Sequence, residues 1–119
     1  MSRTRYFHGG PPGLKSEILP PERTGAASTA QYGAGAVCRR DRVYLTTIPD
    51  AALIFAACAP SLAPGWVYEV EPVGDVEPDP DYLGPAGESM SATRARIYRV
   101  HHRLTIRERH RIQRILVTP

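Results

Sequence analysis

The clearest alternation of apolar and polar positions in the chain runs over residues 66–71. Its side chains would face two sides in turn, with Trp66, Tyr68 and Val70 on one and Val67, Glu69 and Glu71 on the other. A period of two with aromatic and β-branched residues predicts a strand. We expect Pro72 and Gly74 to end this strand, because both residue types weaken strand pairing.

Three further segments have strand character. Residues 5–10 form a short segment that ends in a glycine pair, and residues 42–47 are rich in β-branched and aromatic side chains. Residues 92–102 interleave apolar side chains with arginines and histidines. The last pattern predicts an edge strand with one face in water.

Two helices are predicted by their start signals. Pro49 and Asp50 open one over residues 51–59, because proline suits the first turn and a carboxylate suits the positive end of the helix dipole. Thr105 and Glu108 form a capping box that starts a second helix, of about ten residues. We expect the face of this helix that packs on the core to consist of Ile106, His110, Ile112 or Gln113, and Ile115 or Leu116.

The order of these elements predicts a mixed α+β fold with a small, mostly antiparallel sheet and two short helices. A chain of 119 residues is long enough for a modest core, so we expect a single domain over residues 1–119. Two long loops, residues 14–37 and 82–91, carry no recognisable chemistry. Long loops in compact domains often bind ligands, and the acceptor would depend on these two, although residues 14–37 also fit a poorly ordered insertion.

Composition places the chain among cytoplasmic proteins. Residues 1–10 are polar and basic, unlike a secretory signal, and the longest apolar run, residues 51–59, is too short to span a bilayer. We therefore expect a soluble protein without a membrane partner. Cys38 and Cys58 have no metal or redox spacing, so they are either a buried thiol pair in a reducing compartment or a single disulfide. The sequence shows no zinc, Walker or Rossmann motif, and we expect no metal site.

The net charge of +3 is unevenly distributed. Residues 1–93 carry seven Lys and Arg against eleven Asp and Glu, whereas residues 94–119 carry eight Arg against Glu108 alone. A basic segment on an acidic body predicts either an anionic partner or pairing of that segment with the body.

One acidic residue is held in an unusual way by its neighbours. Asp79 lies between Pro78 and Pro80, and a proline restricts both its own backbone and that of the residue before it. This carboxylate is therefore the candidate chemical centre. His8 precedes two glycines that would let a backbone approach a ligand closely, although an ordinary strand-end histidine fits as well. Tyr44 is either a ligand-stacking ring or a core tyrosine.

Three segments together point to a family. Residues 6–10 are Tyr-Phe-His-Gly-Gly, residues 43–46 are Val-Tyr-Leu-Thr, and residues 70–80 are Val-Glu-Pro-Val-Gly-Asp-Val-Glu-Pro-Asp-Pro. In this order and with comparable gaps they resemble the motifs of the rifampin ADP-ribosyltransferases, small members of the diphtheria-toxin-like ADP-ribosyltransferase fold. Those enzymes show Tyr-x-His-Gly-Thr, Val-Tyr-Phe/Val-Thr/Ser and Val-Glu-Pro-x-Gly-x-x-Glu-Asp-Asp-Pro. The chain differs at Gly10, where the family has threonine, and at Pro78, where it has aspartate; Ser91 stands about where the family often has arginine.

The resemblance implies catalytic residues and a co-substrate. The family's catalytic histidine, tyrosine and aspartate fall on His8, Tyr44 and Asp79, and the implied NAD-binding residues are His8, Gly9, Gly10, Tyr44 and Thr46. Such enzymes cleave the nicotinamide–ribose bond of NAD through an oxocarbenium-like state and pass ADP-ribose to an acceptor. In that scheme Asp79 stabilises the developing positive charge. Tyr44 stacks on the nicotinamide, Gly9 binds its amide through the backbone, and His8 binds the ribose or the diphosphate.

The acceptor stays open at this point, and so do two other functions. By resemblance the acceptor is a rifamycin hydroxyl, but a protein side chain or a nucleic acid also fits the basic C-terminal segment. An RNA 2′-phosphotransferase shares the fold and the use of NAD, although His101 and His102 are adjacent here rather than spaced as in that group. A catalytically silent module that assembles or binds nucleic acid through residues 94–114 is the non-enzymatic alternative.

Overall fold

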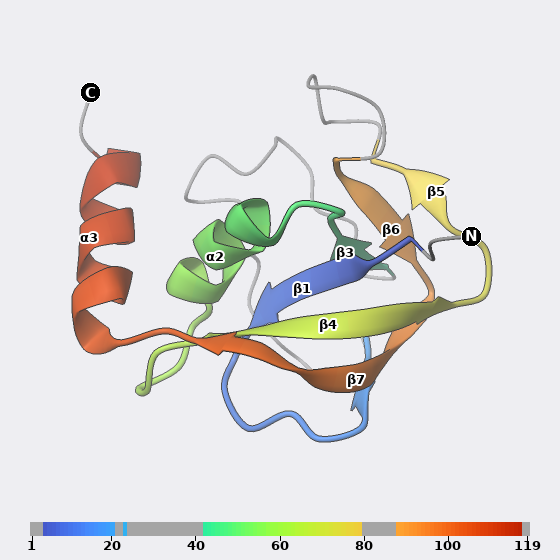
Figure 1. The fold of residues 1–119 in the computed structure, drawn as a ribbon, viewed down its shortest axis with the longest axis horizontal. Helices are drawn as coiled ribbons and strands as arrows, with labels where there is room; N and C mark the ends of the chain where they lie inside the picture. The colour runs from blue at the N-terminus through green and yellow to red at the C-terminus, as the bar shows by residue number, and fades with distance from the viewer. Residues whose placement is uncertain (1–3, 21–22, 24–41, 80–87, 118–119) are drawn as a thin grey trace.

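The structure, a computed structural model, describes residues 4–20, 23, 42–79 and 88–117. In chain order its elements are β1 (Tyr6–Gly10), β2 (Glu17–Ile18), β3 (Val43–Leu45), α2 (Pro49–Cys58), β4 (Trp66–Val73), β5 (Glu77–Pro78), β6 (Met90–Ala92), β7 (Arg94–Arg103) and α3 (Ile106–Val117) (Figure 1). The predicted α+β fold is confirmed, with two helices and a mostly antiparallel sheet core in the part of the chain that the structure describes.

The strands form two small antiparallel sheets. The four-stranded sheet has the order β1-β4-β7-β2, and the three-stranded sheet has the order β3-β6-β5. A single bridge joins them, in which Phe7 N donates to Thr46 O at 2.7 Å and Thr46 N donates to Phe7 O at 2.9 Å. Strands β1 and β3 therefore touch at one point, which brings the segment after Phe7 next to the three-stranded sheet.

The strand predicted by the alternation over residues 66–71 is β4, one of the two inner strands of the four-stranded sheet. It runs through Pro72, which pairs with Ala95, and ends where Gly74 takes a φ of 85°. The expectation that Pro72 ends the strand is therefore wrong. A proline is tolerated there because β1 flanks β4 only as far as Val70, so that this part of β4 lies at an edge.

The strand predicted over residues 92–102 is present as β7, but it is not the edge strand of its sheet, and its predicted first residue, Ala92, belongs to the other sheet. Residues up to Ala92 belong to β6, Thr93 separates them from the next strand, and β7 lies between β4 and β2. Strand β2 covers β7 only at Ala95 and Arg96. Most of the outer edge of β7 is thus not paired by β2, which explains why its sequence has the character of an edge strand.

Helix α2 lies across β1 and β4 (Figure 1) and comes unusually close to them. A Cβ built on Gly9 would lie 2.0 Å from the carbonyl oxygen of Ala52, and one on Gly65 would lie 2.2 Å from that of Ala56. Ala52 and Ala56 are themselves fully buried. Small residues on both sides of this contact therefore set the distance between helix and sheet.

Helix α3 begins with the predicted capping box, since Glu108 N donates to Thr105 Oγ1 at 3.1 Å and Thr105 N donates to Glu108 Oε1 at 2.9 Å. Its predicted core face is correct in part. Ile112 packs against the core cluster beneath α2, and Gln113 and Leu116 are partly buried. His110 is exposed, and so are Ile106 and Ile115 at 62% and 68%.

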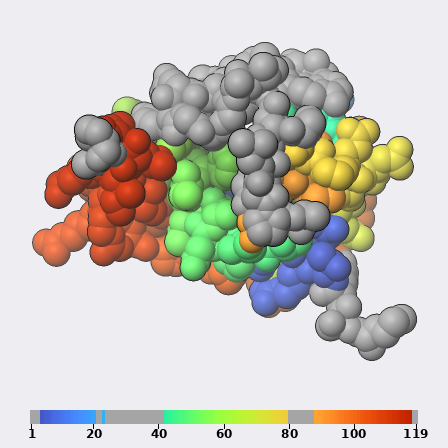
Figure 2. All heavy atoms as spheres, turned by 90° about the horizontal axis from the view of Figure 1, so that it is seen from above, coloured from blue at the N-terminus to red at the C-terminus, as the bar shows by residue number. Residues whose placement is uncertain are grey.

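Hydrogen bonds from α3 reach α2 and the loop after it. Gln113 donates to the carbonyl of Ala57 at 2.8 Å, and Arg109 donates to those of Ser61 at 2.8 Å and Leu62 at 3.1 Å. These side-chain hydrogen bonds hold α3 in addition to the apolar contact of Ile112. In Figure 2 the two helices lie side by side, away from β5 and β6.

The described residues bear on two expectations from composition, which concern a membrane-spanning segment and the two cysteines. No helix among them is long and apolar enough to span a bilayer. Cys58 is buried and carries a free thiol, and burial raises its pKa, whereas Cys38 lies outside the described part of the chain.

Candidate active site

His8 extends from β1 to the three-stranded sheet. Its Nδ1 lies 2.9 Å from the carbonyl oxygen of Tyr44. A carbonyl only accepts hydrogen bonds, so this contact assigns the proton to Nδ1. Burial lowers the pKa of the ring, and the bond to the Tyr44 carbonyl opposes that shift. At neutral pH the imidazole is therefore uncharged, and its Nε2 presents a lone pair that accepts a hydrogen bond.

The two glycines after His8 make room for other parts of the protein. The side of Gly9 on which a Cβ would stand faces α2, and a Cβ on Gly10 would lie 2.9 Å from His8 Nε2. The expectation that these glycines let a backbone approach a ligand closely stays a prediction, and the packing seen here is an additional role. Gly10, where the family pattern has threonine, leaves the imidazole in its present position, and a larger residue there would require the ring to shift.

The backbone of Gly9 nevertheless faces outward in the plane of the sheet. In an antiparallel strand the N–H and C=O groups of residues two apart point to the same edge. Phe7 directs both groups at Thr46, so Gly9 directs both of its groups to that edge too, away from β4. Strand β3 ends at Leu45. A donor and an acceptor of Gly9 therefore lie side by side next to His8.

Tyr44 is the middle residue of β3 and is partly exposed. Across the three-stranded sheet it pairs with Ser91, which in turn pairs with Glu77. Paired residues of antiparallel strands share a face. The neighbouring row contains Leu45 and Met90, which turn to the core between the two sheets. The Tyr44 ring therefore lies on the polar face of the three-stranded sheet.

Asp79 directly follows β5 and is held by β6. Its N–H donates to Ser89 O at 3.0 Å, and Ser89 Oγ donates to Asp79 Oδ2 at 2.8 Å. Because Asp79 stands two residues after Glu77, its side chain shares the face of Glu77 and thus of Tyr44. Two strand spacings, about 10 Å, separate β3 from β5, and Asp79 is offset from Tyr44 by a further two residues along the strand. Of the two prolines expected to fix Asp79, Pro80 lies outside the described residues.

Thr46 occupies the bridge between the sheets. It is buried, and its Oγ1 accepts a hydrogen bond from Ile48 N at 3.0 Å. The hydroxyl thus turns toward the start of α2, while the backbone pairs with Phe7. The structure therefore brings His8 into contact with Tyr44 next to the bridge that Thr46 makes with Phe7, and it places Asp79 on the same face as Tyr44.

Sequence reasoning missed two residues of this region, Ser89 and Arg42. Ser89 carries the hydrogen bond to the Asp79 carboxylate, and no local pattern singles out one serine near the end of a long loop. Arg42 is buried on the polar face. Its position two residues before Tyr44 is the signal that could have found it, because strand residues two apart share a face.

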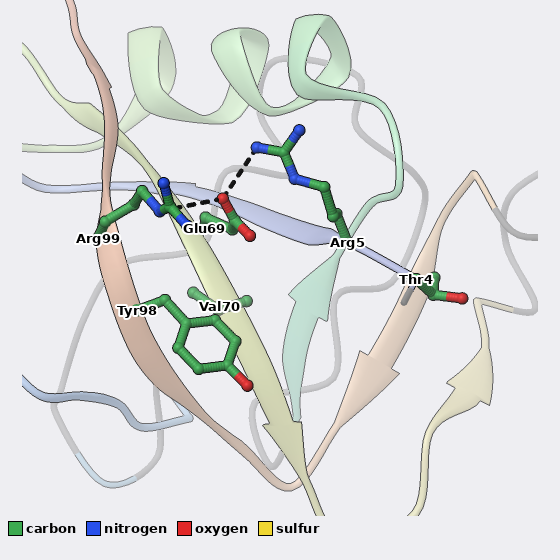
Figure 3. Close-up of a pocket in the computed structure, with 6 residues that line it drawn as sticks. All are labelled: Thr4, Arg5, Glu69, Val70, Tyr98 and Arg99. Atoms are coloured by element: carbon green, nitrogen blue, oxygen red, sulfur yellow. Dashed lines mark hydrogen bonds and ion pairs between the residues drawn. The ribbon is translucent and has the colours of Figure 1, made fainter. Parts of the chain in front are cut away.

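The structure also contains a small pocket elsewhere, of about 100 Å³, lined by Thr4, Arg5, Glu69, Val70, Tyr98 and Arg99 (Figure 3). Arg5 Nη2 lies 2.9 Å and Arg99 Nε 3.4 Å from Glu69 Oε1. In Figure 3 both guanidinium groups turn toward this carboxylate and the Tyr98 ring points away. The bond from Arg5 holds the pKa of Glu69 below its usual value. Sites for drug-sized ligands occupy about 300–1,000 Å³, so this pocket is too small for a dinucleotide.

The ion pairs of Arg5 and Arg99 with Glu69 in this pocket help to show where the basic charge of the C-terminal segment is directed. Two further arginines of β7 also contact the body: Arg94 lies 3.8 Å from Glu17, and the guanidinium of Arg103 lies 4.4 Å from the centre of the Trp66 ring. Much of the basic charge of β7 is thus turned back onto the body of the protein, one of the two arrangements that the charge pattern predicts.

Among the described residues, no group of His, Cys, Asp and Glu side chains is arranged to hold a metal ion.

Comparison with known proteins supplies one finding. The model of the family described as rifampin ADP-ribosyl transferase matches residues 6–109. The match includes β1, β3 and the segment that carries Asp79. No curated protein sequence matches the chain.

Proposed function

Because the chain belongs to the rifampin ADP-ribosyl transferase family, we propose that it cleaves the nicotinamide–ribose bond of NAD and transfers the ADP-ribose to an acceptor. Membership of the family implies ADP-ribosyl transfer. That NAD is the co-substrate, which residues bind it and which acceptor is modified are what we propose. The supporting observation is that His8 contacts Tyr44 while Tyr44 and Asp79 share one face of a sheet.

The tautomer of His8 decides which part of NAD its side chain can bind. A neutral imidazole with its proton on Nδ1 offers only an acceptor at Nε2. A hydroxyl group can donate to that nitrogen, whereas a diphosphate oxygen is itself an acceptor. Of the two roles compatible with the sequence, His8 therefore binds a ribose hydroxyl in this proposal.

The backbone of Gly9 and the Tyr44 ring bind the nicotinamide. A carboxamide carries one acceptor oxygen and a donor NH₂ group, which match the N–H and C=O that Gly9 directs to the edge of β1. Stacking of an aromatic ring contributes about 0.5–1.5 kcal/mol beyond the burial of its area, and Tyr44 supplies such a ring next to His8.

Asp79 acts on the transition state. When bound, NAD supplies the ADP-ribosyl group: the bond from ribose C1′ to the nicotinamide nitrogen breaks with its electron pair passing to nicotinamide, and an acceptor oxygen bonds C1′ and loses its proton. Positive charge develops on the ribose in this step, as in glycoside cleavage. The carboxylate of Asp79, oriented by Ser89, stabilises that charge.

The acceptor proposed first is a hydroxyl group of a rifamycin, in line with the family. A nucleic-acid acceptor finds less support, because β7 arginines contact Glu17, Glu69 and Trp66. Most of the two loops expected to bind the acceptor, including residues 24–37 and 82–87, lies outside the described residues.

Release of nicotinamide tests the proposal. Purified protein with NAD and rifampin should release nicotinamide and yield an ADP-ribosylated antibiotic detectable by mass spectrometry. Asp79→Asn should lower the rate about 10²–10³-fold, the usual effect of losing one charge-stabilising group. Asp50→Asn is the matched control, because Asp50 is an exposed acid at the start of α2 and should leave the rate unchanged. Absence of nicotinamide release, or equal rates for Asp79→Asn and wild type, would refute the proposal.

A further inference from the structure

Arg42 is an arginine that is only 6% exposed, which is unusual for a charged side chain. Its guanidinium makes three hydrogen bonds. Nε donates to Ser91 Oγ at 3.1 Å, and Nη2 donates to the carbonyl oxygens of Ser91 at 2.9 Å and Asp75 at 3.1 Å. Glu77 Oε2 lies 3.7 Å away and supplies a counter-charge.

These partners connect all three strands of the smaller sheet. Arg42 immediately precedes β3, Ser91 belongs to β6, Glu77 belongs to β5, and Asp75 lies in the turn that leads into β5. The planar fork of an arginine suits several acceptors at fixed angles. The side chain therefore joins the ends of the sheet on the face that also carries Tyr44.

Strand β5 needs such a support. It has two residues, both exposed, and it pairs only with β6. An edge strand of this length has few backbone hydrogen bonds of its own. The ion pair with Glu77 adds less, because the Glu77 side chain is about half exposed and the distance is 3.7 Å. The hydrogen bonds of the buried guanidinium to Asp75 and Ser91 thus link the start of β3 to the start of β5.

We propose that Arg42 is a positioning residue for Asp79: it fixes the segment 75–79 against β6 so that the carboxylate faces the space beside Tyr44. This inference rests on the proposed function for its catalytic consequence. Arg42 acts through the backbone of β5 and touches no reacting atom.

Amide hydrogen exchange measures the structural part of the inference without any turnover. The Asp79 amide, which donates to Ser89 O, reports on the segment, and the amides of Phe7 and Thr46 report on the bridge between the sheets. Arg42→Gln should speed exchange at Asp79 about tenfold or more, and Arg42→Lys less, because lysine keeps the charge without the fork. Exchange at Phe7 and Thr46 should change by less than about threefold.

Nicotinamide release measures the catalytic part. In Arg42→Gln, kcat should fall about 10–100-fold while the KM for NAD stays within about threefold, because a misplaced carboxylate mainly affects the transition state. Arg94→Gln removes an exposed arginine that pairs with Glu17 on the other sheet and should change neither readout.

The outcomes separate the two proposals. Unchanged exchange at Asp79 in both Arg42 variants would overturn the positioning role, and so would an unchanged kcat in a folded Arg42→Gln. Should the wild type release no nicotinamide, the proposed function fails while the exchange data still decide whether Arg42 holds the segment. Should Arg42→Gln not fold, Ser91→Ala removes the Oγ acceptor alone and should raise exchange at Asp79 by a smaller factor; no rise there overturns the inference.

Discussion

The two halves of the candidate site are stabilised in different ways. On one side, β1 with His8 and Gly9 lies directly under α2, where buried alanines contact the backbone of the strand. On the other side, Asp79 follows a short exposed strand that is held by hydrogen bonds from Ser89 and Arg42. The first half depends on the exclusion of side-chain volume and the second on polar contacts. A side chain added at the packed glycine of the first half should therefore mainly lower stability, whereas loss of a polar contact in the second half should mainly lower activity.

The largest effect is expected at Gly9, where the helix leaves no space. A Cβ at this position would lie 2.0 Å from Ala52 O and 2.5 Å from Ala56 N, so Gly9→Ala must move α2 as a whole. We expect a loss of about 3 kcal/mol or more in the free energy of unfolding, measured by urea denaturation. Gly13→Ala is the control: Gly13 has a φ of 83° with open space around it, and an alanine there should cost about 1–2 kcal/mol. An equal or smaller effect at Gly9 would show that α2 adapts easily.

A smaller effect, on activity, is expected at Ser89. Ser89→Ala removes the hydrogen bond that orients the Asp79 carboxylate and should lower kcat for nicotinamide release about tenfold. The free energy of unfolding should change by less than about 1 kcal/mol, because this serine is only partly buried. Ser61→Ala, which removes a hydroxyl from an exposed loop after α2, should alter neither quantity. If Ser89→Ala lost stability but released nicotinamide at the wild-type rate, the two halves of the site would not differ in the way described.

The smallest effect is a pH dependence that belongs to His8. Burial lowers its pKa below the ordinary 6.5, so the unfolded chain binds a proton that the folded protein resists. The stabilisation from a neutral His8 is complete above about pH 6.5 and is lost as the pH falls toward the lowered pKa of the folded state. His8→Gln should therefore reduce the drop in unfolding free energy between about pH 7.5 and pH 5.5. An identical drop in variant and wild type would mean that His8 titrates normally in the folded protein.

Local patterns in the sequence were sufficient for several elements. The alternation around Tyr68 predicted β4, the proline at position 49 predicted the start of α2, and the capping box at Thr105 predicted the start of α3. These signals depend on neighbours within a few residues, which the sequence displays directly. The family resemblance likewise identified segments that the structure brings together at His8 and Tyr44.

Features that depend on distant partners could not be predicted in this way. Arg42 and Ser91 are 49 residues apart, and nothing local to either indicates the contact. Pro72 remains within β4 because of where β1 stops, which is a property of the neighbouring strand. The predicted core face of α3 was correct only in part, because Gln113 and Arg109 attach the helix through hydrogen bonds that its apolar pattern does not indicate.

The central claim is that both halves act on one dinucleotide, and an NMR titration tests it most directly. Nitrogen-15-labelled protein would be titrated with a non-cleavable NAD analogue while the backbone amides are followed. We expect the signals of Gly9, Tyr44 and Ser89 to shift together with one dissociation constant, while that of Tyr98, beside the Glu69 pocket, stays in place. Shifts confined to one half of the site, or centred on Tyr98, would contradict the account.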